Sequence, residues 1–300
     1  MCISSIPHNC FIPPFILQEI SQNGTAAQQE HARHSIASSW QFRVSRAATT
    51  GALSVLEADD LAVSTVMERL VYDAQNSSLL PGRLVMGEGD PPTDDKTVNE
   101  AYVGAGATYD LFKHTYGRNS IDDRGMPIIS TVHYGIGYDN AFWNGRQMVY
   151  GDGDEDLPPE QRLFNRFTVS IDIMGHELTH GITQYETGLL YNEQPGALNE
   201  AISDIFGILV KQYYENLTVD ESDWLIGKGL FTENVAGTAI RSMKEPGSAY
   251  DDPVLGKDPQ PGHMDDYVTT TEDAGGVHIN SGILNHAFYV TSMELGGHAW

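Results

Sequence analysis

Two histidines separated by one helical turn are the clearest chemical signal in the sequence. They lie in the run His176-Glu177-Leu178-Thr179-His180. Because an α-helix has about 3.6 residues per turn, side chains four residues apart share a face, and both imidazoles can reach one ion. Glu177 is rotated along that face, where it can hold a water molecule rather than the ion. Alone, this pattern is equally consistent with a surface helix that carries incidental polar residues.

A second candidate helix favours a metal site. Glu200 and Asp204 are again four residues apart, in a segment otherwise rich in Ile, Leu and Phe. Carboxylates buried among such residues without a partner would destabilise the fold, and a divalent ion would remove that cost. We predict that Glu200 is the third ligand and that Asp204 accepts the second ring N–H of a ligating histidine. Two histidines, one carboxylate and an open fourth position are typical of a catalytic zinc site.

The apolar spacing predicts the elements that must position these residues. Helices are expected over residues 51–75, 97–116, 164–185, 197–214 and 281–295, and strands with tight turns over residues 127–150. Residues 84–95 and 251–266 are expected to be loops. Residues 1–50 are polar around one apolar, proline-containing island at residues 11–17. They are interpreted either as a poorly ordered tail or as a docking arm.

The composition is that of a soluble globular protein with about two domains. The chain has 300 residues, 40% of them hydrophobic, and a formal net charge of -24 at pH 7. This charge argues against nucleic acid or an anionic membrane as a partner, because like charges repel. The two cysteines, Cys2 and Cys10, cannot form a disulfide framework for a chain of this size. The first basic residue is Arg33 and no apolar run could span a bilayer, so no classical signal peptide is visible.

Several blocks in the same order make the sequence resemble the thermolysin family of zinc metallopeptidases (M4 type). The blocks are Asn140-Ala-Phe-Trp143, Tyr150-Gly-Asp-Gly153, the histidine motif, residues 196–207, Arg241-Ser-Met243 and Gly275-Gly-Val-His278-Ile-Asn-Ser-Gly282. The run Ile12-Pro-Pro-Phe-Ile-Leu17 is similar to the short propeptides of the protealysin-like branch. The resemblance implies an α+β, two-lobed metallopeptidase fold. A strand-rich N-terminal lobe and a helical C-terminal lobe would flank a cleft floored by the histidine-motif helix.

The resemblance also implies roles for individual catalytic residues. The two histidines of the motif and Glu200 would hold zinc, and Glu177 would be the general base that takes a proton from the attacking water. His278 and Tyr191 would donate hydrogen bonds to the developing oxyanion, and Asp273 would orient His278.

Substrate-binding residues follow from the same resemblance. Asn140 and the backbone of Ala141 would bind the main chain of the substrate, and Arg241 would bind its carbonyl group. An apolar pocket for the residue after the scissile bond would favour a bulky hydrophobic side chain with broad selectivity. The residues expected to line it are Phe164, Phe167, Ile173, Ile226, Leu230 and Ile240.

The implied function is a zinc-dependent endopeptidase that hydrolyses internal peptide bonds before bulky hydrophobic residues and is made as a self-inhibited precursor. Residues 1–50 would be a short inhibitory propeptide, cut near Arg46, that docks on the enzyme. Residues 51–185 would be the N-terminal catalytic lobe with the zinc-motif helix, and residues 186–300 a helical C-terminal lobe. This lobe ends early relative to the family, so a fragment is one interpretation.

Partners and location are expected from the same interpretation. The partners are peptide or protein substrates and the chain's own propeptide, and the enzyme is expected to be a monomer without nucleic-acid or membrane partners. Secretion is expected, with a cytoplasmic precursor as the alternative. A Cys10 thiolate could cap the zinc, although an idle cysteine is the favoured interpretation.

One departure from the family concerns calcium. Three positions that supply calcium-binding carboxylates in the family are Lys211, Leu225 and Lys228 here, whereas Asp172 and Asp223 remain. We expect lysine–aspartate pairs in place of the double calcium site, while calcium at other sites stays open.

Two alternative functions are considered. The first is a catalytically retired scaffold that acts as a binding module; the early end favours it, whereas the intact Glu177 and His278 argue against it. The second is a zinc hydrolase acting on something other than peptides. The Asn140–Ala141 block argues against this, because it would pair with an extended peptide.

Overall fold

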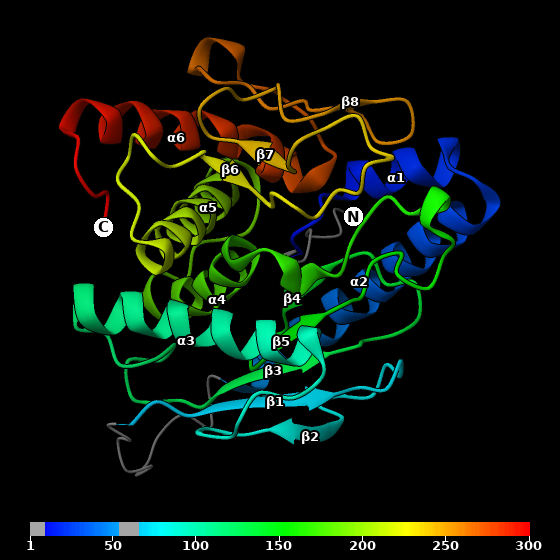
Figure 1. Ribbon diagram of the computed structural model, residues 1–300. Coiled ribbons are helices and arrows are strands. Elements are labelled where there is room, and N and C mark those ends of the chain that lie inside the picture. Colours follow the sequence, from blue (N-terminus) through cyan, green and yellow to red (C-terminus); the bar gives the residue numbers. More distant parts are fainter. Residues whose placement is uncertain (1–9, 54–65) are drawn as a thin grey trace.

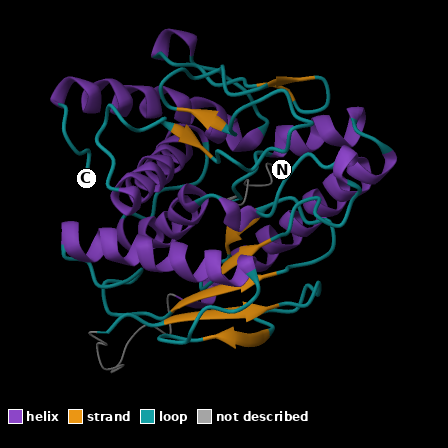
Figure 2. Ribbon diagram, in the orientation of Figure 1, coloured by secondary structure: helices purple, strands orange, loops and turns teal. Residues whose placement is uncertain are grey.

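Among the described residues, the N-terminal half of the chain supplies all strands of the main sheet and three α-helices, whereas the C-terminal half supplies three further α-helices and only two-residue strands (Figure 1 and Figure 2). The computed structural model describes residues 10–53 and 66–300, with side chains described for residues 10–39 and 66–300. The α+β fold class predicted from the sequence is confirmed.

A five-stranded mixed sheet forms the base of the strand-rich half. Its strands, in the order β2-β1-β3-β5-β4, are β2 (Arg83–Met86), β1 (Arg69–Asp73), β3 (Ile128–Val132), β5 (Met148–Tyr150) and β4 (Ala141–Trp143). The pairs β1/β3 and β3/β5 are parallel, whereas β1/β2 and β4/β5 are antiparallel. Because β4 ends the order, its outer edge can pair with another extended segment.

Strand β1 corrects the sequence interpretation. A helix was expected over residues 51–75, yet Arg69–Asp73 is a strand, and residues 54–65 lie outside the described part of the chain. The strand pairs with β3 over its whole length, from Arg69 with Ile128 to Asp73 with Val132. Pairing with a strand 59 residues later in the chain overrides the local helical spacing of the apolar residues. The loop expected at residues 84–95 likewise begins in β2.

The helix expected at residues 97–116 is confirmed as α3 (Lys96–Tyr116). The side chain of Asp95 accepts hydrogen bonds from the backbone N–H groups of Thr97 and Val98, which is a standard N-cap. Gly117 ends the helix in a left-handed conformation with φ 73°, where glycine carries no steric penalty.

Two glycines bring the zinc-motif helix, α4 (Ile171–Glu186), close to α5 (Glu193–Glu215). A Cβ at Gly175 would lie 3.0 Å from the side chain of Val210, and one at Gly207 would lie 2.7 Å from the carbonyl oxygen of Asp172. The helices can approach this closely only because both positions lack a side chain. Helix α4 begins later than expected, because a 3₁₀ turn, η2 (Phe167–Val169), precedes it.

The last long helix, α6 (Asp273–Leu295), begins earlier than the expected residue 281. Ala274, Gly275 and Gly276 have positive φ values, so a left-handed turn opens the helix just before His278. Two short hairpins complete the C-terminal half: β6 (Leu225–Ile226) with β7 (Arg241–Ser242), and β8 (Asp251–Asp252) with β9 (Gly256–Lys257). The second hairpin lies in the segment expected to be a loop.

The N-terminal segment packs into the molecule. An extended stretch from Cys10 leads into α1 (Pro14–Asn23) and α2 (Ala26–Leu53), and Figure 1 shows both helices lying against the rest of the chain. Phe11, Ile12, Ile16, Leu17 and Ile20 are at most 2% exposed and belong to the main hydrophobic core. Over residues 10–39, whose side chains the structure describes, the segment therefore agrees with a docking arm. The expected cleavage position, residue 46, lies within α2.

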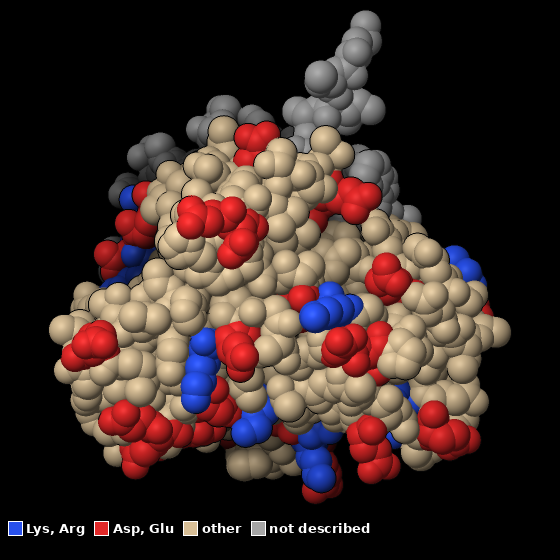
Figure 3. Space-filling view, turned by 90° about the horizontal axis from the view of Figure 1, so that it is seen from above, with Lys and Arg blue, Asp and Glu red and all other residues tan. Residues whose placement is uncertain are grey.

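The surface agrees with the acidic composition. Figure 3 shows Asp and Glu side chains at many places on one face, with Lys and Arg between some of them. Among the helices of the described segments, none is both long and apolar enough to cross a membrane.

Candidate metal centre and active site

Three buried side chains from α4 and α5 converge on one point. The Nε2 atoms of His176 and His180 lie 3.0 Å apart. An oxygen of Glu200 lies 3.5 Å from His176 Nε2, and the other lies 3.3 Å from His180 Nε2. All three residues are at most 1% exposed. A tetrahedral site with bonds of about 2.0–2.1 Å places its ligands roughly 3.3 Å apart, so this spacing suits zinc.

The chemistry of the three residues fits a cation. Glu200 Oε2 is buried and accepts no hydrogen bond, which is costly for a carboxylate oxygen unless an ion balances it. Burial lowers the pKa of His176 to about 4, so its imidazole is neutral near pH 7 and offers a lone pair. A zinc ion bound by these three residues would satisfy all of the inward-facing atoms.

Asp204 orients one of these histidines, as the sequence predicts. Its Oδ1 lies 2.8 Å from His176 Nδ1. Arg241 donates two hydrogen bonds of 2.8 Å to the same carboxylate, and Asn285 Nδ2 donates a third of 2.8 Å. Burial opposes ionisation of Asp204, but the charge of Arg241 and the hydrogen bond from His176 lower its pKa to about 2. The carboxylate therefore stays ionised and fixes the imidazole tautomer.

Three polar partners were missed from the sequence. Asn199 Oδ1 lies 2.8 Å from His180 Nδ1, and Ser203 Oγ lies 3.0 Å from the same atom. Both flank Glu200 on α5, one residue before it and three after it, so helical spacing could have indicated them. Asn285 comes from α6 and carries no such local signal.

Glu177 is held at the end of the sheet. Its Oε2 accepts a hydrogen bond of 2.9 Å from the backbone N–H of Trp143, the last residue of β4. The side chain is fully buried. The edge strand and the zinc-motif helix therefore fix the carboxylate jointly, beside the two histidines of its own helix.

His278 faces the same point from α6. Its Nδ1 lies 2.6 Å from Asp273 Oδ1, and its backbone N–H donates to Asp273 Oδ2 at 2.8 Å. Burial opposes protonation, but the charges of Asp273 and Glu200 raise the pKa of His278 to about 9. The imidazole is then a cationic donor near pH 7. Tyr191 hydrogen-bonds both Glu200 and His278, with 3.2 Å between its hydroxyl and His278 Nε2.

The residues predicted to bind a substrate main chain are bound here to the N-terminal segment. The backbone N–H of Phe11 donates to the carbonyl of Ala141 at 3.0 Å. The side chain of Asn140 accepts from the N–H of Ile12 at 2.9 Å and donates to its carbonyl at 3.3 Å. Cys10 bridges Phe142 in antiparallel fashion. The segment therefore adds a short strand to the open edge of β4.

Side chains of the C-terminal half bind the same stretch. Arg241 Nη1 donates to the carbonyl of Phe11 at 3.3 Å, and its guanidinium lies 4.8 Å from the centre of the Phe11 ring. His278 Nε2 lies 3.2 Å from the carbonyl oxygen of Cys10. That carbonyl group therefore lies beside the residue predicted to bind an oxyanion.

The apolar residues expected to form the specificity pocket belong to the same hydrophobic core as Phe11. Its ring packs edge-on against the ring of His176, with 5.4 Å between the centres. A Cβ at Gly227 would lie 3.1 Å from both Phe11 Cζ and Ile240 Cγ1. The six predicted residues are at most 1% exposed and share one core cluster with Phe11: Phe164, Phe167, Ile173, Ile226, Leu230 and Ile240.

The cysteine does not lie in the metal cluster. Within the described residues, the ligand group at the centre consists of His176, His180 and Glu200. Cys10 packs instead in an apolar cluster with Tyr134, Tyr138, Phe142 and Val149. The structure therefore offers no support for a thiolate cap on zinc.

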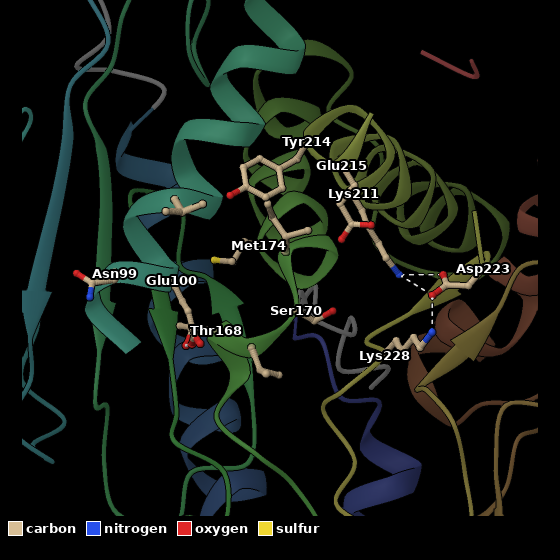
Figure 4. Close-up of a pocket in the computed structure, with 13 residues that line it drawn as sticks. Asn99, Glu100, Thr168, Ser170, Met174, Lys211, Tyr214, Glu215, Asp223 and Lys228 are labelled. Atoms are coloured by element: carbon tan, nitrogen blue, oxygen red, sulfur yellow. Dashed lines mark hydrogen bonds and ion pairs between the residues drawn. The ribbon is translucent and has the colours of Figure 1, made fainter. Parts of the chain in front are cut away.

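Lysine–aspartate pairs are present where the family carries calcium ligands. Lys211 Nζ lies 2.8 Å from Asp223 Oδ1 and 3.7 Å from the fully buried Asp172. Lys228 Nζ lies 3.1 Å from Asp223 Oδ2. Figure 4 shows both lysines pointing at Asp223 on one side of a cavity of about 620 Å³.

These pairs predict a calcium-independent stability. At constant free zinc, adding calcium to the full chain is expected to shift the melting temperature by less than about 2 °C. By contrast, an intact calcium site would add about 2.7 kcal/mol to the free energy of unfolding at a free calcium concentration of about 100 times its Kd. The triple variant Lys211→Glu, Leu225→Glu, Lys228→Glu restores the carboxylates, and calcium should raise its melting temperature. A rise of several degrees in the unmodified chain would contradict the prediction.

Comparisons with known proteins agree with this geometry. A family model described as the thermolysin metallopeptidase catalytic domain matches residues 55–184, and one described as the thermolysin metallopeptidase α-helical domain matches residues 187–300. The extracellular metalloprotease of Pectobacterium carotovorum subsp. carotovorum is 48% identical over 298 residues, which cover 99% of this chain and 82% of that protein.

Two further relatives extend the comparison. Protease PrtS of Photorhabdus sp. (strain Az29) is 46% identical, with 100% of this chain and 80% of that protein covered. The solved structure of the precursor of protealysin, a metalloproteinase from Serratia proteamaculans, matches with a TM-score of 0.85 and 47% identity over 97% of this chain and 82% of that one. The chain therefore belongs to the thermolysin family of zinc-dependent metalloendopeptidases, with the fold of a protealysin-like precursor.

Proposed function

We propose that this chain is the precursor of a secreted endopeptidase that cuts peptide bonds before bulky hydrophobic residues and is silenced by its own N-terminal segment. The observation that carries the proposal is the binding of residues 10–12 by the groups expected to bind substrate. In this proposal residues 1–50 are the propeptide, residues 51–185 the catalytic lobe and residues 186–300 the helical lobe, and the enzyme acts as a monomer.

The geometry of the active site supports separate roles for the zinc ligands and for Glu177. When bound by His176, His180 and Glu200, zinc would supply Lewis-acid polarisation of the scissile carbonyl group and lower the pKa of water toward about 7. Glu177, held by the N–H of Trp143, would accept the proton of the attacking water and pass it to the leaving amine.

Charge that develops on the carbonyl oxygen would be stabilised from the other side of the site. His278, kept protonated by Asp273, and the hydroxyl of Tyr191 would both donate hydrogen bonds to that oxygen. One such preorganised donor is typically worth about 2.7–4 kcal/mol of the barrier. Asn140, Ala141 and Arg241 would hold the substrate main chain in the same way as they hold the N-terminal segment.

The occupant of the apolar cluster supports the proposed specificity. Phe11 is fully buried in the hydrophobic core that also contains the six predicted pocket residues, and its N–H and carbonyl are bound by Ala141 and Arg241. A substrate residue that takes its place would be bulky and apolar. Because such a pocket discriminates by only about 1–3 kcal/mol per methylene, the selectivity would be broad.

Latency follows from the same contacts. The Cys10 carbonyl lies beside His278, the Phe11 carbonyl is bound by Arg241 and Ile12 is bonded to Asn140, so a substrate cannot use these groups until the segment leaves. The matching relatives are named as an extracellular metalloprotease and as the precursor of a metalloproteinase, which supports secretion and a precursor form.

A peptide assay tests the specificity. The full chain, supplied with zinc and activated by a trace of added protease, is offered internally quenched peptides that differ only in the residue after the scissile bond. Leucine or phenylalanine is expected to give kcat/KM at least about 10-fold above alanine, with aspartate as the matched negative control. Bound zinc without any cleavage would favour the retired scaffold, and equal rates for leucine and aspartate would refute the pocket.

A further inference from the structure

A second cluster of metal-binding side chains lies where α2 docks on the catalytic part of the chain. His31 comes from α2, Asp139 lies two residues before β4 and Asp154 follows β5. One potential ligand atom from each residue lies within 4.8 Å of the other two. The three residues are 9%, 2% and 1% exposed respectively.

The surrounding backbone fixes this cluster. Asp154 Oδ1 lies 3.0 Å from His31 Nδ1, while its Oδ2 accepts hydrogen bonds from the N–H groups of Leu163 and Phe164 at 2.8 and 3.1 Å. The backbone N–H of Asp139 donates to Ser35 Oγ on α2 at 2.8 Å.

The imidazole fits against a glycine. At Gly137, which has φ +58°, a Cβ would lie 2.3 Å from the ring of His31, so only glycine leaves room for the ring. Gly137, in the loop that precedes β4, therefore leaves the space that the His31 ring occupies.

One oxygen in the cluster has no partner. Asp139 Oδ1 is buried and accepts no hydrogen bond in the described structure. Burial, followed by the negative charges of Asp154 and Asp156, raises the pKa of Asp139 well above its usual range. Within the described residues, the ion pairs of Asp154 and Asp156 are both with His31, and none reaches Asp139. A buried carboxylate in this position needs a cation or a proton.

We propose that His31, Asp139 and Asp154 bind a divalent transition-metal ion that links α2 to the catalytic lobe. One imidazole nitrogen with two carboxylate oxygens is a ligand set that zinc and its neighbours accept, whereas calcium and magnesium prefer oxygen alone. With Nδ1 of His31 as the ligand, Nε2–H points to Asp156 Oδ2 at 3.5 Å. Ligating histidines usually donate their second N–H to a carboxylate in this way.

The consequence for regulation rests on the proposed function. The ion would join a residue of the proposed propeptide to two residues that flank β4 and β5, the strands next to the active site. It would keep the segment docked even after its connection to the enzyme is cut. Metal at this site would therefore prolong latency.

Metal counting tests the site independently of turnover. The full chain with Glu177→Ala, which cannot process itself, is equilibrated with a low concentration of Zn²⁺ by dialysis, and zinc per chain is measured by mass spectrometry. Two equivalents are expected. His31→Ala and the isosteric Asp139→Asn, each in the same background, are expected to bind one.

The matched control is His263→Ala, which removes an exposed histidine 3.3 Å from Asp265 and should leave two equivalents. Circular dichroism checks that Asp139→Asn remains folded. The proposal would be overturned if the Glu177→Ala chain bound only one zinc ion and that ion occupied the active site. It would also be overturned if a second zinc ion bound and neither His31→Ala nor Asp139→Asn removed it. The zinc count does not depend on whether the N-terminal segment inhibits the enzyme. The experiment therefore tests the second metal site separately from the proposed inhibition.

Discussion

Replacing Glu177 by alanine is expected to lower kcat/KM of the activated enzyme for peptide hydrolysis by about 10²–10⁴-fold, the usual contribution of a general base. The carboxylate lies beside the metal-binding histidines but is not one of the three converging ligands. The zinc content should therefore remain unchanged. Activity is measured with a quenched peptide that carries leucine after the scissile bond, and zinc by mass spectrometry.

The control for this prediction is Glu233→Ala, which removes an exposed glutamate and should leave kcat/KM within about two-fold, as surface changes usually do. Glu177→Gln keeps the size of the side chain and should be as inactive as the alanine variant. Cleavage that persists at the original rate in either Glu177 variant would refute the proposed mechanism.

Replacing Phe11 by alanine is expected to expose the active site of the uncut chain. Phe11 is fully buried against His176 and Arg241, and truncation of such a side chain costs about 3–5 kcal/mol. Because 1.4 kcal/mol is a factor of ten, a fluorescent peptide with leucine at the matching position should bind at least about 100-fold more tightly. The measurement uses the Glu177→Ala background, so that the chain is not cut during titration.

Phe15→Ala is the matched control, because Phe15 belongs to the same segment but is only half-buried on α1. It should change peptide affinity much less than Phe11→Ala does. Equal affinities for the Phe11 variant and the parent chain would mean that the segment does not compete with substrate.

Local spacing predicted the metal ligands because each pair lies on one helix. His176 and His180 are one turn apart on α4, and Glu200 and Asp204 are one turn apart on α5. The number of residues per turn is the same in every α-helix, so this spacing can be recognised in the sequence. That the two helices face each other depends on the close approach at Gly175 and Gly207, which no periodicity reveals. The oxyanion and substrate-binding residues were found only through the family resemblance, and their roles stay predictions.

Contacts between residues far apart in the sequence could not be predicted from local patterns. Strand β1 has apolar residues at helix-compatible positions, but it lies between β2 and β3 and pairs with both as a strand. Asn285 reaches Asp204 across 81 residues of sequence, so its partner is invisible until α6 is placed. The N-terminal segment is polar overall, and its docking depends on the few apolar side chains that fit a surface built by both halves.

In the proposed precursor, the hydrogen bonds of residues 10–12 to Asn140, Ala141 and Arg241 have a consequence for competition with free peptides. An inhibitor joined to its target by a short chain competes at an effective concentration in the millimolar range, however dilute the protein is. In the proposed precursor, dilution therefore leaves the inhibition unchanged. A free peptide displaces the segment only when the ratio of its concentration to its Kd exceeds the ratio of the effective concentration to the Kd of the segment. Once the connection is cut, the effective concentration no longer applies, and the segment stays bound only as long as its own contacts with the enzyme hold it.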